Sequence, residues 1–264
     1  MDLKLKNKRA LVTGSSAGIG FAIAQLLSRE GAVVVVNGRS VDRVEAAAKK
    51  IRSGGAKGEV IAAAADLSTM VGVKALLRQV PEVDILVNNL GMYAPKAFEQ
   101  ITDEDWLDIF QVNVLSGIRL TRAYLPHMRT QNWGRIIFIS SESGINIPAE
   151  MIHYGMTKTA QLAVSRGLAE TTAGTGVTVN AVLPGPTRSE GVEEFVKAMA
   201  RAGKTDAAAV ETEFFKSVRP SSLLKRFAAP EEVAAMVAFV ASPLSSATNG
   251  AALRVDGGVV RSIV

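Results

Sequence analysis

Tyr154 and Lys158, in the segment HYGMTK (153–158), place a phenol and an amine four residues apart. Residues at i and i+4 lie on one face of a helix, so both side chains can approach the same point. A tyrosine has a pKa of about 10 and seldom acts as a base near neutral pH unless a positive charge stabilises its phenolate. Lys158 could supply that charge. The pair is therefore a candidate acid and base, and an ordinary exposed helix face is the alternative.

The segment TGSSAGIG (13–20) lies between the first apolar run and the first helical pattern. Its glycines, Gly14, Gly18 and Gly20, would let the backbone approach a pyrophosphate at a helix N-terminus, where free N–H groups and the helix dipole favour an anion. Glycines also occur at tight turns for packing alone. The position near the chain start, directly after a strand and before a helix, favours a nucleotide site.

Short β-branched runs alternate with longer helical patterns along most of the chain. The runs are nearly continuous in Val, Ile, Leu and Ala, as expected of parallel strands covered on both faces. The sequence therefore predicts a single-domain α/β fold over 1–264, a doubly wound parallel sheet of about seven strands with helices on both faces. The expected strands are 9–13, 33–37, 58–66, 84–89, 135–140, 177–184 and 251–255; the expected helices are 18–29, 41–53, about 70–79, about 103–128, one holding Tyr154 and Lys158, and one from Pro230.

Residues of about 188–225 do not continue this alternation of strands and helices. They are more polar, and their pattern predicts two helices outside the sheet. They follow a strand end, and the carboxyl ends of the strands border the ligand site in open α/β sheets. We therefore expect a lid over the substrate, with a plain surface insertion as the alternative.

Composition excludes several kinds of chemistry. The 264 residues include no cysteine, which excludes disulfides and thiolate catalysis, and the two histidines are too few for a His-rich metal site, so no metal is expected. The net charge of +5 comes from scattered Lys and Arg without a dense basic run, so no nucleic-acid partner is expected. With no signal-peptide pattern and no apolar stretch of about 18 residues, the sequence indicates a cytoplasmic protein that does not contact membranes.

Over nearly its whole length the chain resembles the short-chain dehydrogenase/reductase family. TGSSAGIG resembles the family's cofactor loop, YGMTK (154–158) its YxxxK motif, and NNLG (88–91) its NNAG segment, with Leu90 replacing alanine. The other landmarks are Asp66-Leu67 as the adenine-contacting pair, Asn113 in VNVLS, Ser141, Pro184-Gly185 with Thr187, and the closing DGG (256–258).

The resemblance implies a Rossmann-like fold and a role for each motif residue. Tyr154 would donate a proton to the substrate carbonyl as a hydride arrives from the nicotinamide, and Ser141 would hydrogen-bond the same oxygen. Lys158 would also bind the ribose hydroxyls, and Asn113 would anchor a water in a proton relay to that lysine. The cofactor residues implied are Gly14, Ser16, Gly18, Ile19, Gly20, Arg39, Ser40, Asp66, Leu67, Asn89, Gly91, Tyr154, Lys158, Pro184, Gly185 and Thr187.

The implied activity is reduction of a ketone, or oxidation of a secondary alcohol, with a nicotinamide cofactor. Reduction of a 3-oxoacyl thioester of fatty-acid type is an alternative that these landmarks do not separate from it. A dehydratase or epimerase on the same fold, or a protein that senses nucleotide without turnover, is disfavoured because the glycine loop and the Ser, Tyr and Lys are intact.

The segment VVVVNGRS (33–40) bears on the choice of nicotinamide. NAD enzymes carry an acidic residue about twenty positions past the glycine loop for the ribose 2'-OH, whereas an arginine accommodates the 2'-phosphate of NADP. Gly38 occupies that position, and Arg39 and Ser40 follow it. The sequence predicts NADP(H), with NAD(H) as a weaker alternative, and a solvent-exposed turn is the competing interpretation. Ala17 stands where many NADP-preferring relatives carry a second basic residue.

Two further expectations concern the substrate and the assembly. The residues expected to line the substrate pocket, together with His153, are Met92, Tyr93, Ser143, Ile145, Met151 and the stretch after Thr187. They are mostly apolar or small, which favours a ketone or β-keto ester over a free sugar. The resemblance implies a homotetramer through helices 103–128 and 155–172 and the C-terminal strand region. Apolar residues beyond what one sheet face can cover support it, namely Ile109, Val112, Leu115 and Leu120.

Overall fold

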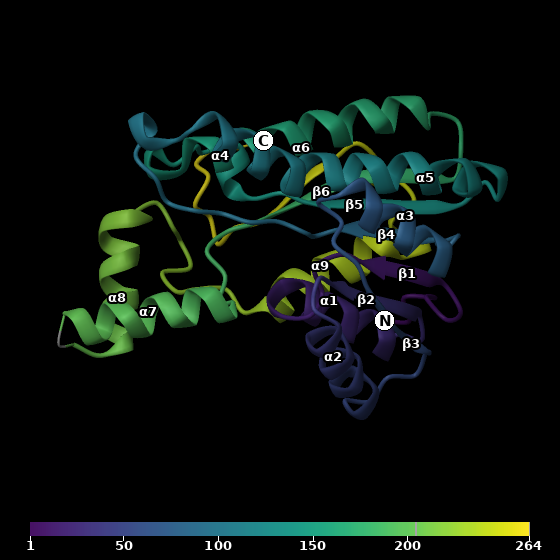
Figure 1. The fold of residues 1–264 in the computed structure, drawn as a ribbon, viewed down its shortest axis with the longest axis horizontal. Coiled ribbons are helices and arrows are strands. Elements are labelled where there is room, and N and C mark those ends of the chain that lie inside the picture. The colour runs from purple at the N-terminus through teal and green to yellow at the C-terminus, as the bar shows by residue number, and fades with distance from the viewer. Residues whose placement is uncertain (204, 264) are drawn as a thin grey trace.

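One parallel sheet lies between two layers of helices in the computed structural model, which describes residues 1–203 and 205–263 (Figure 1). Its seven strands run in the order β3-β2-β1-β4-β5-β6-β7, and every neighbouring pair is parallel. This confirms the predicted doubly wound sheet. The strands are β1 Arg9–Val12, β2 Val33–Gly38, β3 Val60–Ala64, β4 Ile85–Asn88, β5 Gly134–Ile139, β6 Val177–Pro184 and β7 Ala252–Val255.

The two faces of the sheet carry separate cores. One is packed under α1 (Gly18–Arg29), α2 (Val41–Ser53) and α9 (Pro230–Ala241), and the other under α3 (Met70–Gln79), α5 (Ser116–Thr130) and α6 (Ile152–Thr171). Successive strand residues contribute to opposite cores: Val12 belongs to the first and Leu11 to the second. Both faces are therefore buried, which is why the strands read as continuous apolar runs rather than as alternating ones.

The helix expected over 103–128 is interrupted by a π-helical turn. It consists of α4 (Asp103–Phe110), a π-helical turn at Gln111–Leu115, and α5. The backbone carbonyl of Asn113 accepts a hydrogen bond from the Gln161 side chain at 2.6 Å. A side chain that bonds into the helix ladder is one of the recognised causes of such a distortion, and π-turns are frequent at functional sites.

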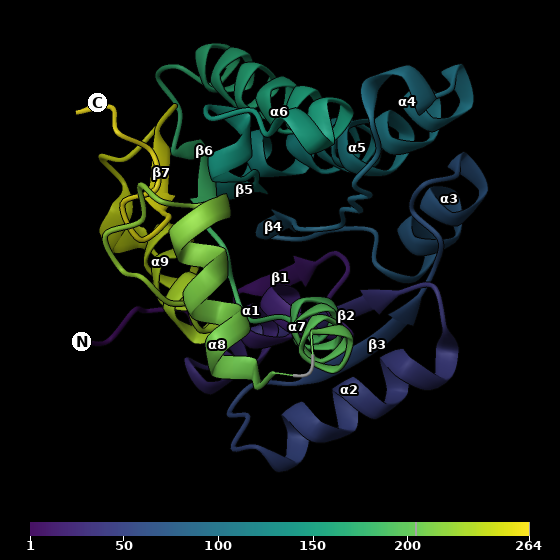
Figure 2. The same ribbon diagram turned by 90° about the vertical axis from the view of Figure 1, so that its left-hand side faces the viewer.

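Residues beyond Thr187 form two helices outside the sheet, as predicted. They are α7 (Glu190–Ala202) and α8 (Ala207–Glu213), and a π-helical turn, Phe214–Val218, continues α8. In Figure 1 they project to the left of the two helix layers, and in Figure 2, which faces that side, they lie in front of the sheet. They enclose a small apolar cluster that includes the buried side chains of Val196, Phe215 and Phe227.

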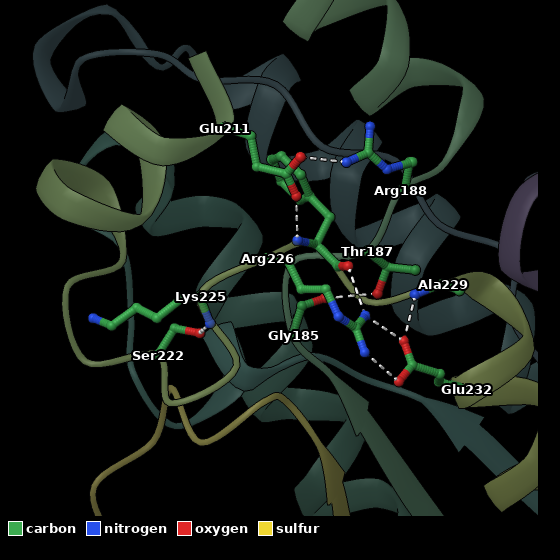
Figure 3. A network of polar contacts seen from close by, with 10 residues as sticks. Gly185, Thr187, Arg188, Glu211, Ser222, Lys225, Arg226, Ala229 and Glu232 are labelled. Carbon is green, nitrogen blue, oxygen red and sulfur yellow. Dashed lines mark hydrogen bonds and ion pairs between the residues drawn. The ribbon is translucent and has the colours of Figure 1, made fainter. Parts of the chain in front are cut away.

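The two ends of this segment are tied together where it joins the body (Figure 3). Thr187 and Ala228 form an isolated parallel bridge. Glu211 pairs with Arg188 through one carboxylate oxygen and accepts the backbone N–H of Phe227 through the other at 2.8 Å. The stem of the insertion is thus held by polar contacts, while its helices project beyond it.

Within the described ranges, no helix is long and apolar enough to cross a membrane. Nor do the residues that the structure describes include a group of three or more His, Asp or Glu placed to hold a metal ion.

Candidate active site

A cavity of about 870 Å³ opens at the carboxyl ends of the central strands. The strand order reverses between β1 and β4, and in open α/β sheets ligands bind at such a switch point. Lining residues come from the ends of β5 and β6, from α6 and from the insertion after Thr187. Those predicted as site residues are Ile19, Asn89, Gly91, Ser141, Tyr154, Lys158, Pro184, Gly185 and Thr187.

Helix α6 presents Tyr154 and Lys158 to this cavity from one face. The Lys158 Nζ atom lies 5.5 Å from the centre of the Tyr154 ring. It donates hydrogen bonds to the backbone oxygen of Ile139 at 2.9 Å and to Oε1 of Gln161 at 3.2 Å. The amine is thereby fixed between the end of β5 and the next turn of its own helix.

Ser141 follows β5 and faces the same tyrosine. Its hydroxyl accepts the backbone N–H of Ser143 at 3.1 Å and so caps the short turn Glu142–Gly144. Burial raises the pKa of the Tyr154 phenol to about 12, a hydrogen bond with Ser141 offsets part of this rise, and the nearby Glu142 carboxylate adds to it. At neutral pH the phenol is therefore protonated and is placed as a proton donor.

Burial has the opposite effect on Lys158, because it disfavours the charged form of an amine. It lowers the pKa of the Lys158 ammonium to about 7. Stabilisation of the phenolate by Lys158 therefore stays a prediction. The groups that lower the pKa of Tyr154 are Ser141 and, to a smaller extent, Arg219.

Asn113 reaches the site from the π-helical turn. Its side-chain amide accepts the backbone N–H of Met92 at 2.8 Å and donates to the Met92 carbonyl at 2.9 Å. Its own backbone carbonyl is linked to Lys158 by Gln161, whose Nε2 donates to Asn113 and whose Oε1 accepts from Lys158. The water relay that the resemblance implies at Asn113 stays a prediction beside this side-chain link. Gln161 was not predicted from the sequence, although its position three residues after Lys158 places both side chains on the same face of the helix.

The glycine loop has the backbone that its sequence requires. Gly14 and Gly18 have φ values of +61° and +57°, which favour glycine, and a Cβ atom on Gly20 would lie 2.5 Å from the Gly14 carbonyl oxygen. Helix α1 begins at Gly18 without a side-chain cap, so its first N–H groups are open to an anion. A second hollow of about 260 Å³ adjoins this helix start.

Two asparagines support the loop from neighbouring strands. Asn89 donates through Nδ2 to the carbonyls of Thr13 and Gly14 at 2.9 and 3.0 Å. Asn37, near the end of β2, accepts the Ser15 N–H at its backbone carbonyl and donates its own backbone N–H to the Ser15 hydroxyl, and its side-chain Oδ1 accepts from Gly14 N–H at 3.4 Å. Asn89 thus shapes the cradle as well as lining the cavity, and Asn37 is a supporting residue that sequence analysis missed.

At the expected adenosine end, Gly38 packs against Ser16: a Cβ on Gly38 would lie 3.2 Å from the Ser16 hydroxyl oxygen. Arg39 is exposed and has no hydrogen bond or ion pair with any residue that the structure describes. The Ser40 hydroxyl caps α2 by accepting from Arg43 N–H at 3.4 Å. The guanidinium of Arg39 is therefore the group left to meet a phosphate.

Asp66 and Leu67, the other expected adenine contacts, lie just after β3. The Asp66 carboxylate accepts from the backbone N–H and the hydroxyl of Ser68 at 3.0 and 2.7 Å. Leu67 is buried in the second core, so its side chain packs inward rather than toward a ligand.

Most of the expected substrate-pocket residues line the cavity, but two do not. Met92, Tyr93, Ser143 and Met151 line it. Ile145 is 45% exposed and lies outside the described lining, because the chain turns outward after Gly144. His153 is buried on another side of α6 and meets the Trp106 ring edge-on at 5.9 Å, so the expectation that it lines the pocket is wrong.

A charged cluster that sequence analysis missed forms part of the cavity wall. Arg219, from the insertion, donates through Nε to the Glu142 carboxylate at 2.9 Å, and its Nη1 lies 3.7 Å from Glu150. Glu142 is only 3% exposed, and its second oxygen has no partner in the part of the chain that the structure describes. Arg219 lies 77 residues after Glu142 and 69 residues after Glu150, so no local sequence pattern could predict these contacts.

Comparison with known proteins assigns the class of this chain. A family model described as short chain dehydrogenase matches residues 8–200. The chain is 48% identical over 263 residues to the uncharacterized oxidoreductase YvaG of Bacillus subtilis, covering 100% of both. It is 34% identical to the 3-oxoacyl-[acyl-carrier-protein] reductase FabG of Aquifex aeolicus, over 98% of this chain and 100% of that one.

Among solved structures, L-sorbose reductase from Gluconobacter frateurii, complexed with NADPH and L-sorbose, superposes with a TM-score of 0.93 at 31% identity and 100% coverage of both chains. The protein therefore belongs to the short-chain dehydrogenase family and is an oxidoreductase by class.

Proposed function

We propose that this protein is an NADP(H)-dependent oxidoreductase that transfers a hydride between the nicotinamide and a ketone or secondary alcohol. The observation that carries the proposal is the convergence of Ser141, Tyr154 and Lys158 on one cavity beside the glycine loop. A nicotinamide cofactor, when bound, supplies the hydride chemistry, and the protein supplies position and electrostatics.

The cradle around the glycine loop fits a dinucleotide. Gly20 lets the start of α1 pack tightly against the loop at Gly14, and the uncapped start of α1 offers N–H groups to a pyrophosphate. Gly91, on the same side, lies against Lys158: a Cβ there would be 3.4 Å from Nζ. Lys158 would bind the ribose hydroxyls from this position, and Pro184, Gly185 and Thr187 would border the nicotinamide.

Tyr154 is the proton donor in the reducing direction. A phenol with a pKa raised to about 12 holds its proton at neutral pH until negative charge develops on the substrate oxygen. Ser141 would donate its hydroxyl hydrogen to the same oxygen and so fix the carbonyl for attack. In the oxidising direction Tyr154 accepts the proton from the alcohol, with Lys158 and Asn113 behind it as positioning groups.

Preference for NADP(H) rests on Gly38 and Arg39. No carboxylate stands at position 38 to repel a 2'-phosphate, and the unpaired Arg39 guanidinium can make two parallel contacts with phosphate oxygens. The relative of known structure that superposes on this chain at TM-score 0.93 was solved with NADPH, which supports the same choice.

Reduction of a 3-oxoacyl thioester is the second candidate. The 34% identity to a 3-oxoacyl-[acyl-carrier-protein] reductase over almost the whole chain favours it. We keep it second because the substrate side of the cavity carries charged groups that a long acyl chain would not use.

The proposal is tested by following nicotinamide absorbance with a panel of ketones, 3-oxoacyl thioesters and sugars, each with NADPH and with NADH. We expect NADPH oxidation with at least one ketone class. Turnover with NADH alone would contradict the cofactor assignment, and no oxidation with any carbonyl compound would contradict the proposed reaction.

A further inference from the structure

Most residues that line the cavity are apolar or small, as expected from the sequence, but its substrate side also carries a charged cluster. Apart from Lys158, the charged residues in its described lining are Glu142, Glu150 and Arg219. Glu142 and Arg219 line the same cavity as Tyr154, and both influence the pKa of its phenol. A substrate whose carbonyl meets Tyr154 must therefore meet this cluster as well.

Arg219 already contacts two carboxylates of the protein, which limits the substrates that it can recognise. Its guanidinium is bonded to buried Glu142 at 2.9 Å and faces Glu150 at 3.7 Å. Two carboxylates against one guanidinium leave a net negative charge on this wall. A second anion would be repelled at short range in a partly buried site, where charges are poorly screened. The cluster thus disfavours substrates with a carboxylate.

The same cluster offers hydrogen bonds to a neutral, hydroxylated molecule. The Glu150 side chain is half exposed to the cavity and makes only the long contact with Arg219, so its oxygens can accept from substrate hydroxyls. Ser217 also lies in the wall. Arg219 and Glu150 can together donate to and accept from neighbouring hydroxyl groups.

The buried carboxylate of Glu142 is unexpected at this place, because it makes proton donation by Tyr154 less favourable. A buried carboxylate beside Tyr154 makes the phenol harder to ionise, and one of its oxygens has no described partner. Its one ion pair is with Arg219. Glu142 therefore acts as a positioning residue, which holds Arg219 at the substrate end of the cavity.

We propose that the substrate is an uncharged ketone bearing hydroxyl groups next to its carbonyl, or the corresponding polyol, with Glu150 accepting from a substrate hydroxyl and Arg219 donating to another. The inference rests on the proposed function and replaces the expectation of an apolar ketone or β-keto ester. It places the enzyme among those that act on sugars and polyols rather than on oxo acids.

The test compares three ketones that share a four-carbon chain and differ in their substituents: erythrulose (hydroxylated), butanone (unsubstituted) and acetoacetate (anionic). NADPH oxidation is measured with the wild type, with Glu150→Gln and with Glu213→Gln. Glu213 is an exposed carboxylate just before the π-helical turn of the insertion and does not line the cavity, so it is the matched control.

We expect the wild type to favour erythrulose over acetoacetate by about tenfold or more in kcat/KM, the size of one charge-assisted hydrogen bond. Glu150→Gln should lower kcat/KM for erythrulose by about tenfold. It should leave butanone within about twofold and raise the value for acetoacetate, because the wall loses its net negative charge. A merely structural role for Glu150 would lower all three values together. Glu213→Gln should change none of them.

Two results would overturn the inference while leaving the proposed function standing: a wild type that prefers acetoacetate or butanone, or a Glu150→Gln variant that lowers all three values equally. Failure of every carbonyl compound to oxidise NADPH is a different outcome. It would contradict the proposed function itself.

Discussion

Lys158 combines a positive charge with almost complete burial, and this combination has a measurable cost. Its pKa is lowered from an ordinary value of 10.5 to about 7, because the folded protein disfavours the ammonium. Unfolded chains bind the proton up to about pH 10, so between these two values the unfolded state holds more protons and folding stability rises with pH. Below pH 7 both states are charged and the full penalty applies.

Replacing Lys158 with Met should therefore stabilise the cofactor-free protein at low pH. We expect the advantage of Lys158→Met in unfolding free energy to be largest below pH 7 and to shrink toward pH 10, by about 1.4 kcal/mol for each unit by which the pKa is lowered. Urea unfolding of both proteins from pH 6 to pH 10 measures it. A difference that does not change with pH would show that Lys158 titrates normally.

The choice of cofactor also depends on a single residue, because the exposed guanidinium of Arg39 would make the contact that favours NADPH. Arg39→Ala should reduce kcat/KM with NADPH by roughly ten- to a hundredfold, the size of a charge-assisted hydrogen bond, and leave NADH within about threefold. Steady-state kinetics with both cofactors measure this, and Arg52→Ala, on the far end of α2, is the control. Equal losses with both cofactors would argue against a phosphate contact.

At the scale of elements, the insertion after Thr187 forms one wall of the cavity. Val192, Phe214 and Arg219 all line it, while the stem is tied by the contacts of Arg188 and Glu211 (Figure 3). We propose that α7 and α8, with the π-helical turn, act as a lid that tightens when cofactor and substrate bind, since closing excludes water from the reaction.

Limited trypsin digestion tests the lid. Lys216 is exposed on its π-helical turn, and we expect NADPH with substrate to slow cleavage there by at least about fivefold, because cleavage requires local opening. Cleavage at Lys6, near the N-terminus, should be unaffected. Unchanged cleavage at Lys216 would indicate a plain surface insertion.

Sequence patterns predicted the sheet and its helices well because both follow from local periodicity. The π-helical turn at Gln111–Leu115 was not predictable in that way: it depends on Gln161, which lies 48 residues further along the chain. The same limit applies at the site. The motif residues could be named from their order, whereas the contact of Arg219 with Glu142 joins the insertion to the turn after β5 and exists only in the folded chain.

In the whole molecule, two of the apolar residues expected to support a tetramer are covered by the chain itself. Ile109 and Leu120 are buried in this chain's own core, so they need no partner. Leu107, on α4, remains 64% exposed, and β7 is an edge strand. We still propose a homotetramer through α4 to α6 and the C-terminal region, on the basis of family membership.

Light scattering at micromolar concentration should give about four times the chain mass of 27.9 kDa. Leu107→Glu should lower that mass by placing a charge in the interface. Val71→Glu, at a residue that is also exposed but lies on α3, should not. A monomeric wild type would contradict the proposal.

The central claim is that Tyr154 delivers the proton in a nicotinamide-dependent reduction, and Tyr154→Phe tests it most directly. The variant removes the phenolic hydroxyl but leaves the glycine loop and Lys158 in place. Single-turnover oxidation of bound NADPH, measured together with the NADPH dissociation constant, separates chemistry from binding. The account predicts a loss of at least about a thousandfold in turnover with NADPH affinity within about threefold of wild type. Turnover within tenfold of the wild type would contradict it.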